Sequence, residues 1–104
     1  MITVPLKIVR FISDSQPGFV AGELVDAYGR VHTFEDKVGV ITSDHLTADS
    51  NYPCEGEQAC TILHRWTEDG RELVRICTGW PLDNPSTKGE YHFVVLGEQL
   101  SSDT

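Results

Sequence analysis

The 104-residue chain is long enough for one domain with a modest hydrophobic core, and its 39% apolar and 23% charged residues exclude a disordered or fibrous class. No apolar run approaches the roughly 20 residues that cross a bilayer, and Lys7 and Arg10 interrupt the apolar stretch of a secretory signal, so we expect a cytoplasmic protein with no membrane contact. Eight Lys and Arg against sixteen Asp and Glu give a net charge of −8, which disfavours nucleic acid. The acidic excess either keeps the protein soluble or attracts a basic protein partner.

The apolar segments are short, rich in Val, Ile, Phe and Thr, and separated by Gly, Pro, Asp and Asn, a pattern typical of strands and turns. The predicted strands, in chain order, are 6–12, 19–25, 30–34, 38–42, 58–66, 72–78 and 91–96. One helical turn is expected at 43–46, and hairpin loops of three residues that end on glycine are predicted at 27–29 and 68–70. Two long loops, 47–57 and 79–90, and a frayed tail at 100–104 complete the chain.

Seven short strands with connections of two to twelve residues predict an all-β fold. We expect a small single-domain antiparallel β-barrel over residues 1–104, with a small β-sandwich as the alternative. The first and last strands, LKIVRFI and HFVVL, are nearly unbroken apolar runs, and neither has the composition of an exposed edge. They are therefore expected to pair with each other and close the barrel.

The stretch ELVDAYGRVHTF gathers Asp26, Tyr28, Arg30 and His32, side chains that a small acid–base catalyst would use. The same stretch fits a hairpin whose loop ends on Gly29 in the left-handed region. The hairpin register sets Val25 opposite Val31, Gly22 opposite Phe34, and Asp26 opposite Arg30 as an ion pair. Because Tyr28 then lies at an exposed tip, the four polar residues are not expected to converge, and the stretch is interpreted as scaffold.

The three cysteines, Cys54, Cys60 and Cys77, are an odd number in a chain without a predicted signal peptide, so no disulfide framework is expected. Matching the apolar residues of the second hairpin sets Ile62 opposite Ile76, and Cys60 and Cys77 then point to opposite faces. These two are expected to fill the core, whereas Cys54 is expected to be the reachable thiol.

Metal and cofactor chemistry finds no support in the residue spacing. Cys60 and His64 would lie about 13 Å apart on one strand, far beyond the reach of a shared metal ion. The sequence has no GxSxG elbow, no GxGxxG and no phosphate loop. We therefore predict no metal, no cofactor and no catalytic residue.

The two long loops are the best binding candidates, because function tends to lie on loops held by a rigid sheet. Tyr52 lies in the first loop, and Trp80 and Asp83 lie in the second. Tyrosine and tryptophan often anchor protein interfaces. The alternative is that both rings plug the open ends of the barrel.

The runs PGFVAGELVDAYGRVHTFEDKVGVIT, NYPCEGEQAC and LVRICTGWPLDNPSTKGEYHFVVLGEQL belong to a pattern that spans nearly the whole chain. They resemble a group of short bacterial proteins of unknown function, in which a Pro-Gly-Phe-Val opening, a Leu-x-Asp-Ala-x-Gly hairpin, a Lys-Val-x-Val-Ile segment and a closing Phe-Val-Val strand recur. These motifs are turn and core residues, so the resemblance implies a shared fold and assigns no functional residue.

Our first hypothesis is a non-enzymatic acidic module that docks a basic protein partner through loops 47–57 and 79–90, as a monomer or weak homodimer. A toxin-neutralising immunity-type protein is one form of this hypothesis, since many such proteins are small and acidic.

The alternative is a small enzyme or ligand carrier with a pocket at one mouth of the barrel. It would use His45 or His92 together with Asp83 or Asp44. A histidine and a carboxylate within about 3.2 Å of each other, at the floor of a concave pocket, would favour this alternative.

Overall fold

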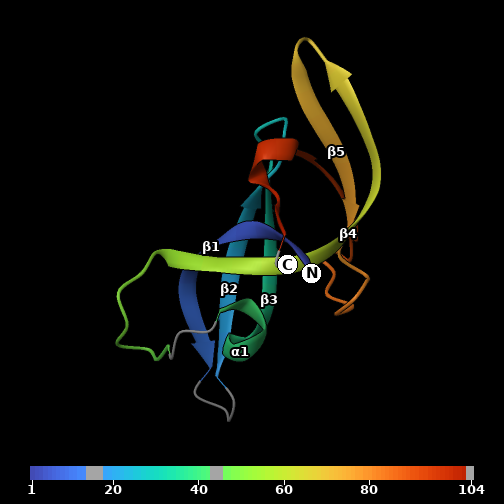
Figure 1. Cartoon of the computed structure of the whole chain (residues 1–104). Helices are drawn as coiled ribbons and strands as arrows, with labels where there is room; N and C mark the ends of the chain where they lie inside the picture. The colour runs from blue at the N-terminus through green and yellow to red at the C-terminus, as the bar shows by residue number, and fades with distance from the viewer. Residues whose placement is uncertain (14–17, 43–45, 103–104) are drawn as a thin grey trace.

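The computed structural model describes residues 1–13, 18–42 and 46–102, and these are mostly β-structure. The elements in chain order are β1 (Ile2–Ser13), β2 (Phe19–Val25), β3 (Val31–Lys37), α1 (Val38–Ile41), β4 (Cys54–Glu68), β5 (Arg71–Cys77), β6 (His92–Leu96), η1 (Gly97–Gln99) and β7 (Ser101–Ser102). The strands form one antiparallel sheet, in the order β3-β2-β1-β4-β5-β6, that curls into a half-barrel (Figure 1). The predicted all-β antiparallel barrel is confirmed. Neither α1 nor η1, the helices of the described ranges, is long or apolar enough to cross a membrane.

The first strand, β1, lies at the centre of the sheet, between β2 and β4. Its alternate residues Val4, Leu6 and Ile8 are buried, which accounts for its apolar sequence. The expectation that the first and last long strands pair is wrong, since β6 pairs with β5. The chain ends meet instead through β7, whose two residues pair with the start of β1 where a frayed tail was expected.

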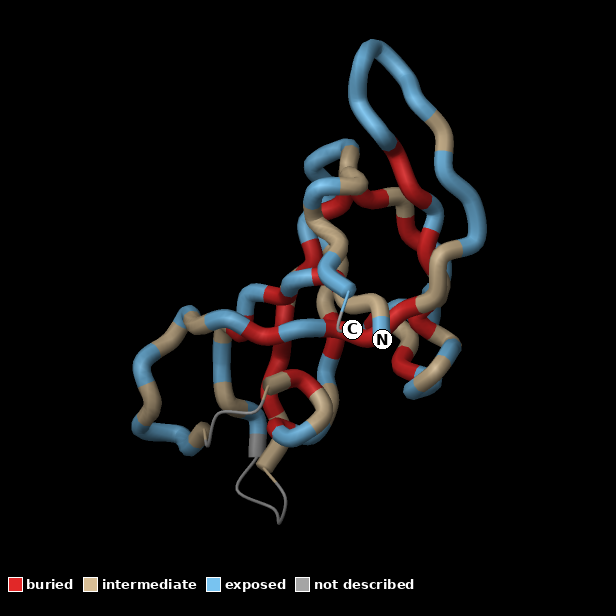
Figure 2. The backbone as a smooth tube through the Cα atoms, in the orientation of Figure 1, coloured by how far each residue is buried: buried red, intermediate tan, exposed pale blue. Residues whose placement is uncertain are grey.

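The long strand β4 joins the two halves of the half-barrel. Its first part pairs with β1 and its second part with β5, and the tip of the β4–β5 hairpin projects away from the body with both of its strands exposed (Figure 2). β4 begins at Cys54, so the predicted loop 47–57 is four residues shorter than expected. Its pairing with β1 continues as far as Cys54, which lies opposite Ile8. Gly56 permits this pairing, because a β-carbon there would lie 2.6 Å from Ile41 and 2.8 Å from Ile8.

The segment 38–42 was predicted to be a strand, and this prediction is wrong. Val38–Ile41 forms α1, a single helical turn in which the Thr42 amide donates to the Val38 carbonyl at 2.9 Å. The turn buries Val38 and Ile41, three positions apart and therefore on one helical face. A short apolar run fits a buried strand or a buried helical turn equally well. Most of the helical turn expected at 43–46 lies outside the described residues.

The β2–β3 hairpin has the predicted register, with Val25 opposite Val31 and Gly22 opposite Phe34, and Gly29 has a φ of +80°. The β4–β5 turn is tighter than predicted: Glu68 pairs with Arg71, which leaves a loop of two residues. Both loop residues have positive φ, as an Asp-Gly turn of type I′ requires.

The two edge strands, β3 and β6, face each other across the open side of the half-barrel. Phe93 of β6 packs edge-on against Phe34 and His32 of β3, with ring centroids 5.4 and 4.8 Å apart. Two backbone hydrogen bonds bridge the same gap, from the Ala27 amide to the Val94 carbonyl and from the Thr87 amide to the Thr33 carbonyl, both at 2.8 Å. We call this junction of β3 and β6 the seam.

We predict that Gly29→Val destabilises the protein by about 1–2 kcal/mol, because a β-branched residue is strained at positive φ. The neighbouring Tyr28→Ala serves as control and should change stability by less than about 0.5 kcal/mol, since the ring is 54% exposed. Urea denaturation of both variants measures the difference, and equal losses would contradict the assigned role of Gly29.

Candidate functional site

The loop that carries Trp80 is closed at its base by two hydrogen bonds. The Asn84 amide donates to the Thr78 carbonyl at 3.0 Å, and the Thr78 hydroxyl donates to the Asn84 carbonyl at 2.7 Å. The Thr61 hydroxyl of β4 also donates to the Trp80 carbonyl at 3.1 Å. These bonds tie the backbone of residues 79–83 to the sheet at both ends, and we call this segment the tryptophan loop.

A buried amide pair fixes the same loop from below. The Asn84 side-chain amide donates to Gln58 Oε1 at 2.6 Å, and Gln58 Nε2 donates to the Ala59 carbonyl at 3.0 Å. Gln58 is completely buried and Asn84 is 5% exposed. Because unpaired amides in the interior cost more free energy than paired ones gain, this pair holds the loop in one position.

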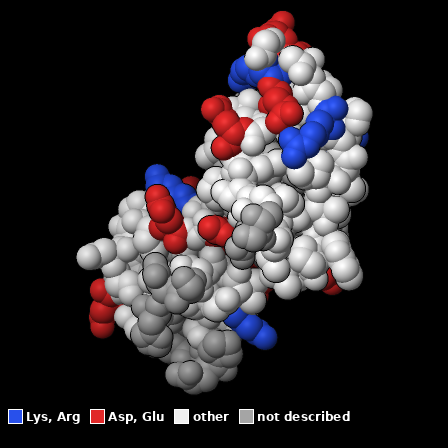
Figure 3. All heavy atoms as spheres, viewed as in Figure 1, with Lys and Arg blue, Asp and Glu red and all other residues white. Residues whose placement is uncertain are grey.

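The indole of Trp80 projects from this fixed base and is 69% exposed, the largest exposed fraction among the large hydrophobic residues of the described chain. Leu82, two residues on, is 43% exposed. The surface over the tryptophan loop carries few charged atoms, whereas charges crowd on the projecting β4–β5 hairpin (Figure 3). The prediction that the Trp80 ring plugs an end of the barrel does not fit this exposure.

Beside Leu82 lies an open groove of about 580 Å³ between β4, α1 and the start of β1. Its apolar walls are formed by Met1, Pro5, Leu6, Val40, Ile41, Ala59 and Leu82. Two carboxylates, Glu55 and Glu57, also line it, and its lining includes no Lys or Arg. We call the tryptophan loop and this groove together the docking face.

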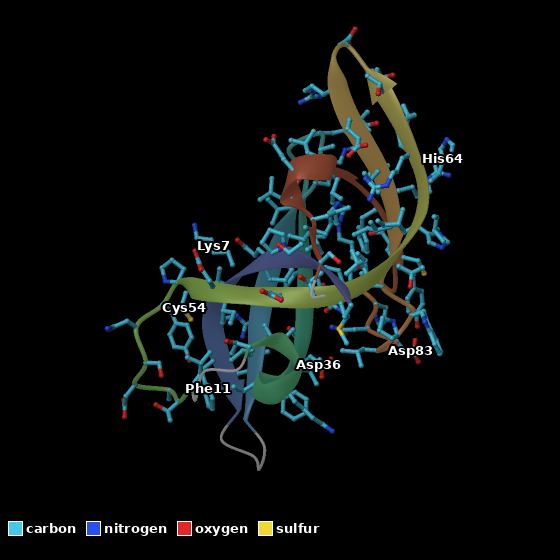
Figure 4. All side chains as sticks on the ribbon, viewed as in Figure 1. Lys7, Phe11, Asp36, Cys54, His64 and Asp83 are labelled. Carbon is cyan, nitrogen blue, oxygen red and sulfur yellow. The ribbon has the colours of Figure 1, made fainter. Side chains whose placement is uncertain are left out.

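Of the other two predicted binding residues, Asp83 belongs to the docking face and Tyr52 does not. Asp83 lies in the tryptophan loop and accepts a hydrogen bond from the Tyr91 hydroxyl at 2.9 Å, which raises the pKa of Tyr91. The Tyr52 hydroxyl donates to the Thr47 carbonyl at 2.7 Å, and its ring packs against the core. Cys54, next to the Tyr52 loop, and Asp83 lie far apart, at the left and right of the molecule in Figure 4, so the two predicted loops do not form one surface.

The four polar residues of the β2–β3 hairpin converge more than the sequence indicated. Asp26, Tyr28, Arg30 and His32 all line one hollow of about 300 Å³ at the seam. Asp26 also has a different side-chain partner from the one predicted: its Oδ2 lies 2.8 Å from His32 Nε2 rather than against the Arg30 side chain. Strand pairing places alternate residues on one face, but the rotation of the Asp26 side chain could not be inferred from the register.

The Asp26 carboxylate is held by three donors. Its Oδ1 accepts from the amides of Tyr28 and Arg30 at 2.9 and 3.0 Å, and its Oδ2 pairs with His32. Burial raises the pKa of Asp26, but the hydrogen bonds from His32, Arg30 and Tyr28 together outweigh it, so the pKa lies below the ordinary value. The carboxylate therefore remains charged and orients the His32 ring.

The histidines and carboxylates proposed for an active site are not assembled as expected. His45 and Asp44 lie outside the described residues, and Asp83 is bonded to Tyr91 rather than to His92. A histidine and a carboxylate within about 3.2 Å of each other occur instead at Asp26 and His32, in the lining of the seam hollow. Because the Asp26 carboxylate also accepts the Tyr28 and Arg30 amides of its own hairpin, we interpret the pair as part of the turn.

No disulfide joins Cys54, Cys60 and Cys77, in agreement with the sequence. Burial raises the pKa of the Cys60 thiol to about 11, with a smaller contribution from Cys77, so Cys60 is an unreactive core residue. Cys77 is partly exposed, like Cys54, and so does not fill the core as completely as predicted.

Comparison of the chain with protein-family models, with curated proteins and with solved structures finds no match. The residues of the site must therefore be interpreted from their own geometry.

Gln58→Leu and Asn84→Leu should each destabilise the protein by about 1–3 kcal/mol, because each leaves a buried amide without its partner. The double variant should lose less than the sum, since it removes both polar groups together. Urea denaturation of the wild type, the two single variants and the double variant measures the coupling free energy between the two amides, with Glu57→Gln as an exposed control. Additive losses would contradict a structural role for the pair.

The acid sensitivity of the fold should depend on Asp26. Because its pKa is lower in the folded than in the unfolded chain, the carboxylate stabilises the fold above about pH 4, and this contribution disappears as the pH falls through the folded pKa. Asp26→Asn should therefore cost about 1–3 kcal/mol at pH 6 and less at pH 3. Urea titrations at both pH values provide the test, and a loss independent of pH would contradict it.

Proposed function

We propose that the protein is a non-enzymatic docking module that binds a basic protein partner through its docking face, with Trp80 as the anchor. The observation that carries this proposal is an exposed tryptophan on a loop whose base is fixed by buried hydrogen bonds. Tryptophan is among the residues that dominate binding energies when they enter a pocket of the partner.

Fixing the loop before binding favours association. Burying the exposed part of an indole gains on the order of 3 kcal/mol in transfer free energy. A flexible loop would lose part of this gain through the entropy of ordering its backbone on binding. The bonds from Thr78, Asn84 and Thr61 have already ordered the tryptophan loop, so little of the gain is offset.

The charge of the protein specifies the chemistry of the partner. Glu55 and Glu57 line the groove, no base does, and the whole chain carries a charge of −8. A partner segment with Lys or Arg beside an apolar pocket would complement this face, and the opposite charges would raise the association rate. A nuclease toxin neutralised by an immunity-type protein is one partner of this kind.

The predicted binding loop that carries Tyr52 is not part of this proposal, although the sequence analysis included it. The ring of Tyr52 packs on the core, and its hydroxyl is bonded within its own loop. Its contribution is therefore to the stability of the fold.

The proposal is tested by affinity capture from lysate at low and high salt, with wild-type protein, Trp80→Ala and Tyr28→Ala as bait. Tyr28 is the matched control because it is also an exposed aromatic residue on a turn, but lies outside the docking face. We expect a basic partner whose affinity falls at least about 10-fold in Trp80→Ala, is unchanged in Tyr28→Ala and weakens with salt.

Urea denaturation should show that Trp80→Ala is as stable as the wild type, since the ring is mostly exposed. Equal capture by both variants, or no partner at any salt concentration, would overturn the proposal.

A further inference from the structure

The seam holds a second concave region that shares no lining residue with the docking groove. The hollow of about 300 Å³ beside Asp26 adjoins another of about 460 Å³, and the two share Arg30, His32 and Glu90. The backbone bonds of Ala27 and Thr87 bridge the two edges of the seam. Both hollows open onto this junction, and the smaller has the ring of Phe93 in its lining.

The seam concentrates positive charge in an acidic protein. Arg30 and Arg75 line the smaller hollow, and Lys88 lines the larger, so three of the eight Lys and Arg residues, from three separate segments, line these two adjoining hollows. In the described chain, Arg10 pairs with Glu35 and Arg65 with Glu72, and His32 contacts Asp26. None of the three seam bases takes part in these contacts, so their charges are available to a ligand.

The two carboxylates of the seam lining, Asp26 and Glu90, offset only part of the charge of these three bases. Asp26 is 93% buried in its side chain and already accepts three hydrogen bonds, which leaves Glu90 as the exposed carboxylate of the lining. His92 also lines the smaller hollow, and Asp26 fixes the orientation of His32 beside it. At physiological ionic strength the more distant acids of the chain are screened beyond about 8 Å.

We propose that the seam is a binding site for the phosphate group of a small molecule. Two guanidinium groups with planar sets of donors match the oxygens of a phosphate, and Lys88 adds a third positive charge. A phosphate monoester carries a charge of about −1.5 to −2 near neutral pH. A ligand of this charge complements three bases better than a carboxylate ligand with a single negative charge. The smaller hollow is at the lower end of the volumes of ligand pockets, so the ligand is small.

The test is a titration of the full chain with inorganic phosphate at constant ionic strength, followed in ¹H–¹⁵N correlation spectra. Parallel titrations use sodium chloride and sodium acetate. We expect phosphate to shift the amides of residues 28–32 and 92–94 saturably, and chloride to leave them unchanged. Binding of acetate as tight as that of phosphate would overturn the assignment to phosphate, and an unsaturable response would overturn the site.

Charge-neutralising variants locate the site. Arg75→Gln should weaken phosphate binding about 10-fold, because it removes one charge-assisted contact. Arg71→Gln is the matched control, an exposed base on the same strand whose side chain does not line the seam. Equal effects of the two variants would mean that net charge alone governs the response, and would overturn the proposal. Unchanged thermal unfolding without phosphate verifies that both variants are folded.

Discussion

The hydrogen bond between the buried amides of Gln58 and Asn84 is the interaction on which the rest of the account depends. It joins the first part of β4, where this strand pairs with β1 near the centre of the sheet, to the loop that leaves β5. Without it, the two buried amides would lack each other as hydrogen-bond partners, and the tryptophan loop would no longer be fixed to the sheet. With it, the exposed Trp80 ring becomes part of a rigid surface.

The same half-barrel presents two chemically different regions. The docking face combines an exposed indole, apolar walls and carboxylates, whereas the seam gathers unpaired bases around a fixed Asp26–His32 pair. This division follows from the topology, because β1 and β4 occupy the centre of the sheet and leave β3 and β6 as the edges that meet at the seam. Opposite charges on separate regions are what the two proposals, a basic partner at the docking face and an anionic ligand at the seam, both require.

Local patterns in the sequence predicted the strands, the β2–β3 register and the left-handed Gly29, because these depend on side-chain alternation and turn chemistry. The central position of β1 and the early start of β4 could not be predicted in this way. Both depend on which strands pair across long separations in the chain, and the close packing of Gly56 on Ile8 and Ile41 has no local signature. The helical turn at Val38–Ile41 shows the same limit for a short apolar run.

For the candidate site, the sequence analysis named Trp80 and Asp83 but not what holds them, since Gln58 and Asn84 lie 26 residues apart and resemble ordinary surface residues. The most direct test of the central claim is ¹⁵N relaxation of the amides in the tryptophan loop. A pre-ordered loop predicts order parameters near about 0.85 for residues 79 to 84, like those of the strands. Values below about 0.6 would show a flexible loop and would contradict the claim that buried hydrogen bonds hold Trp80 ready for a partner.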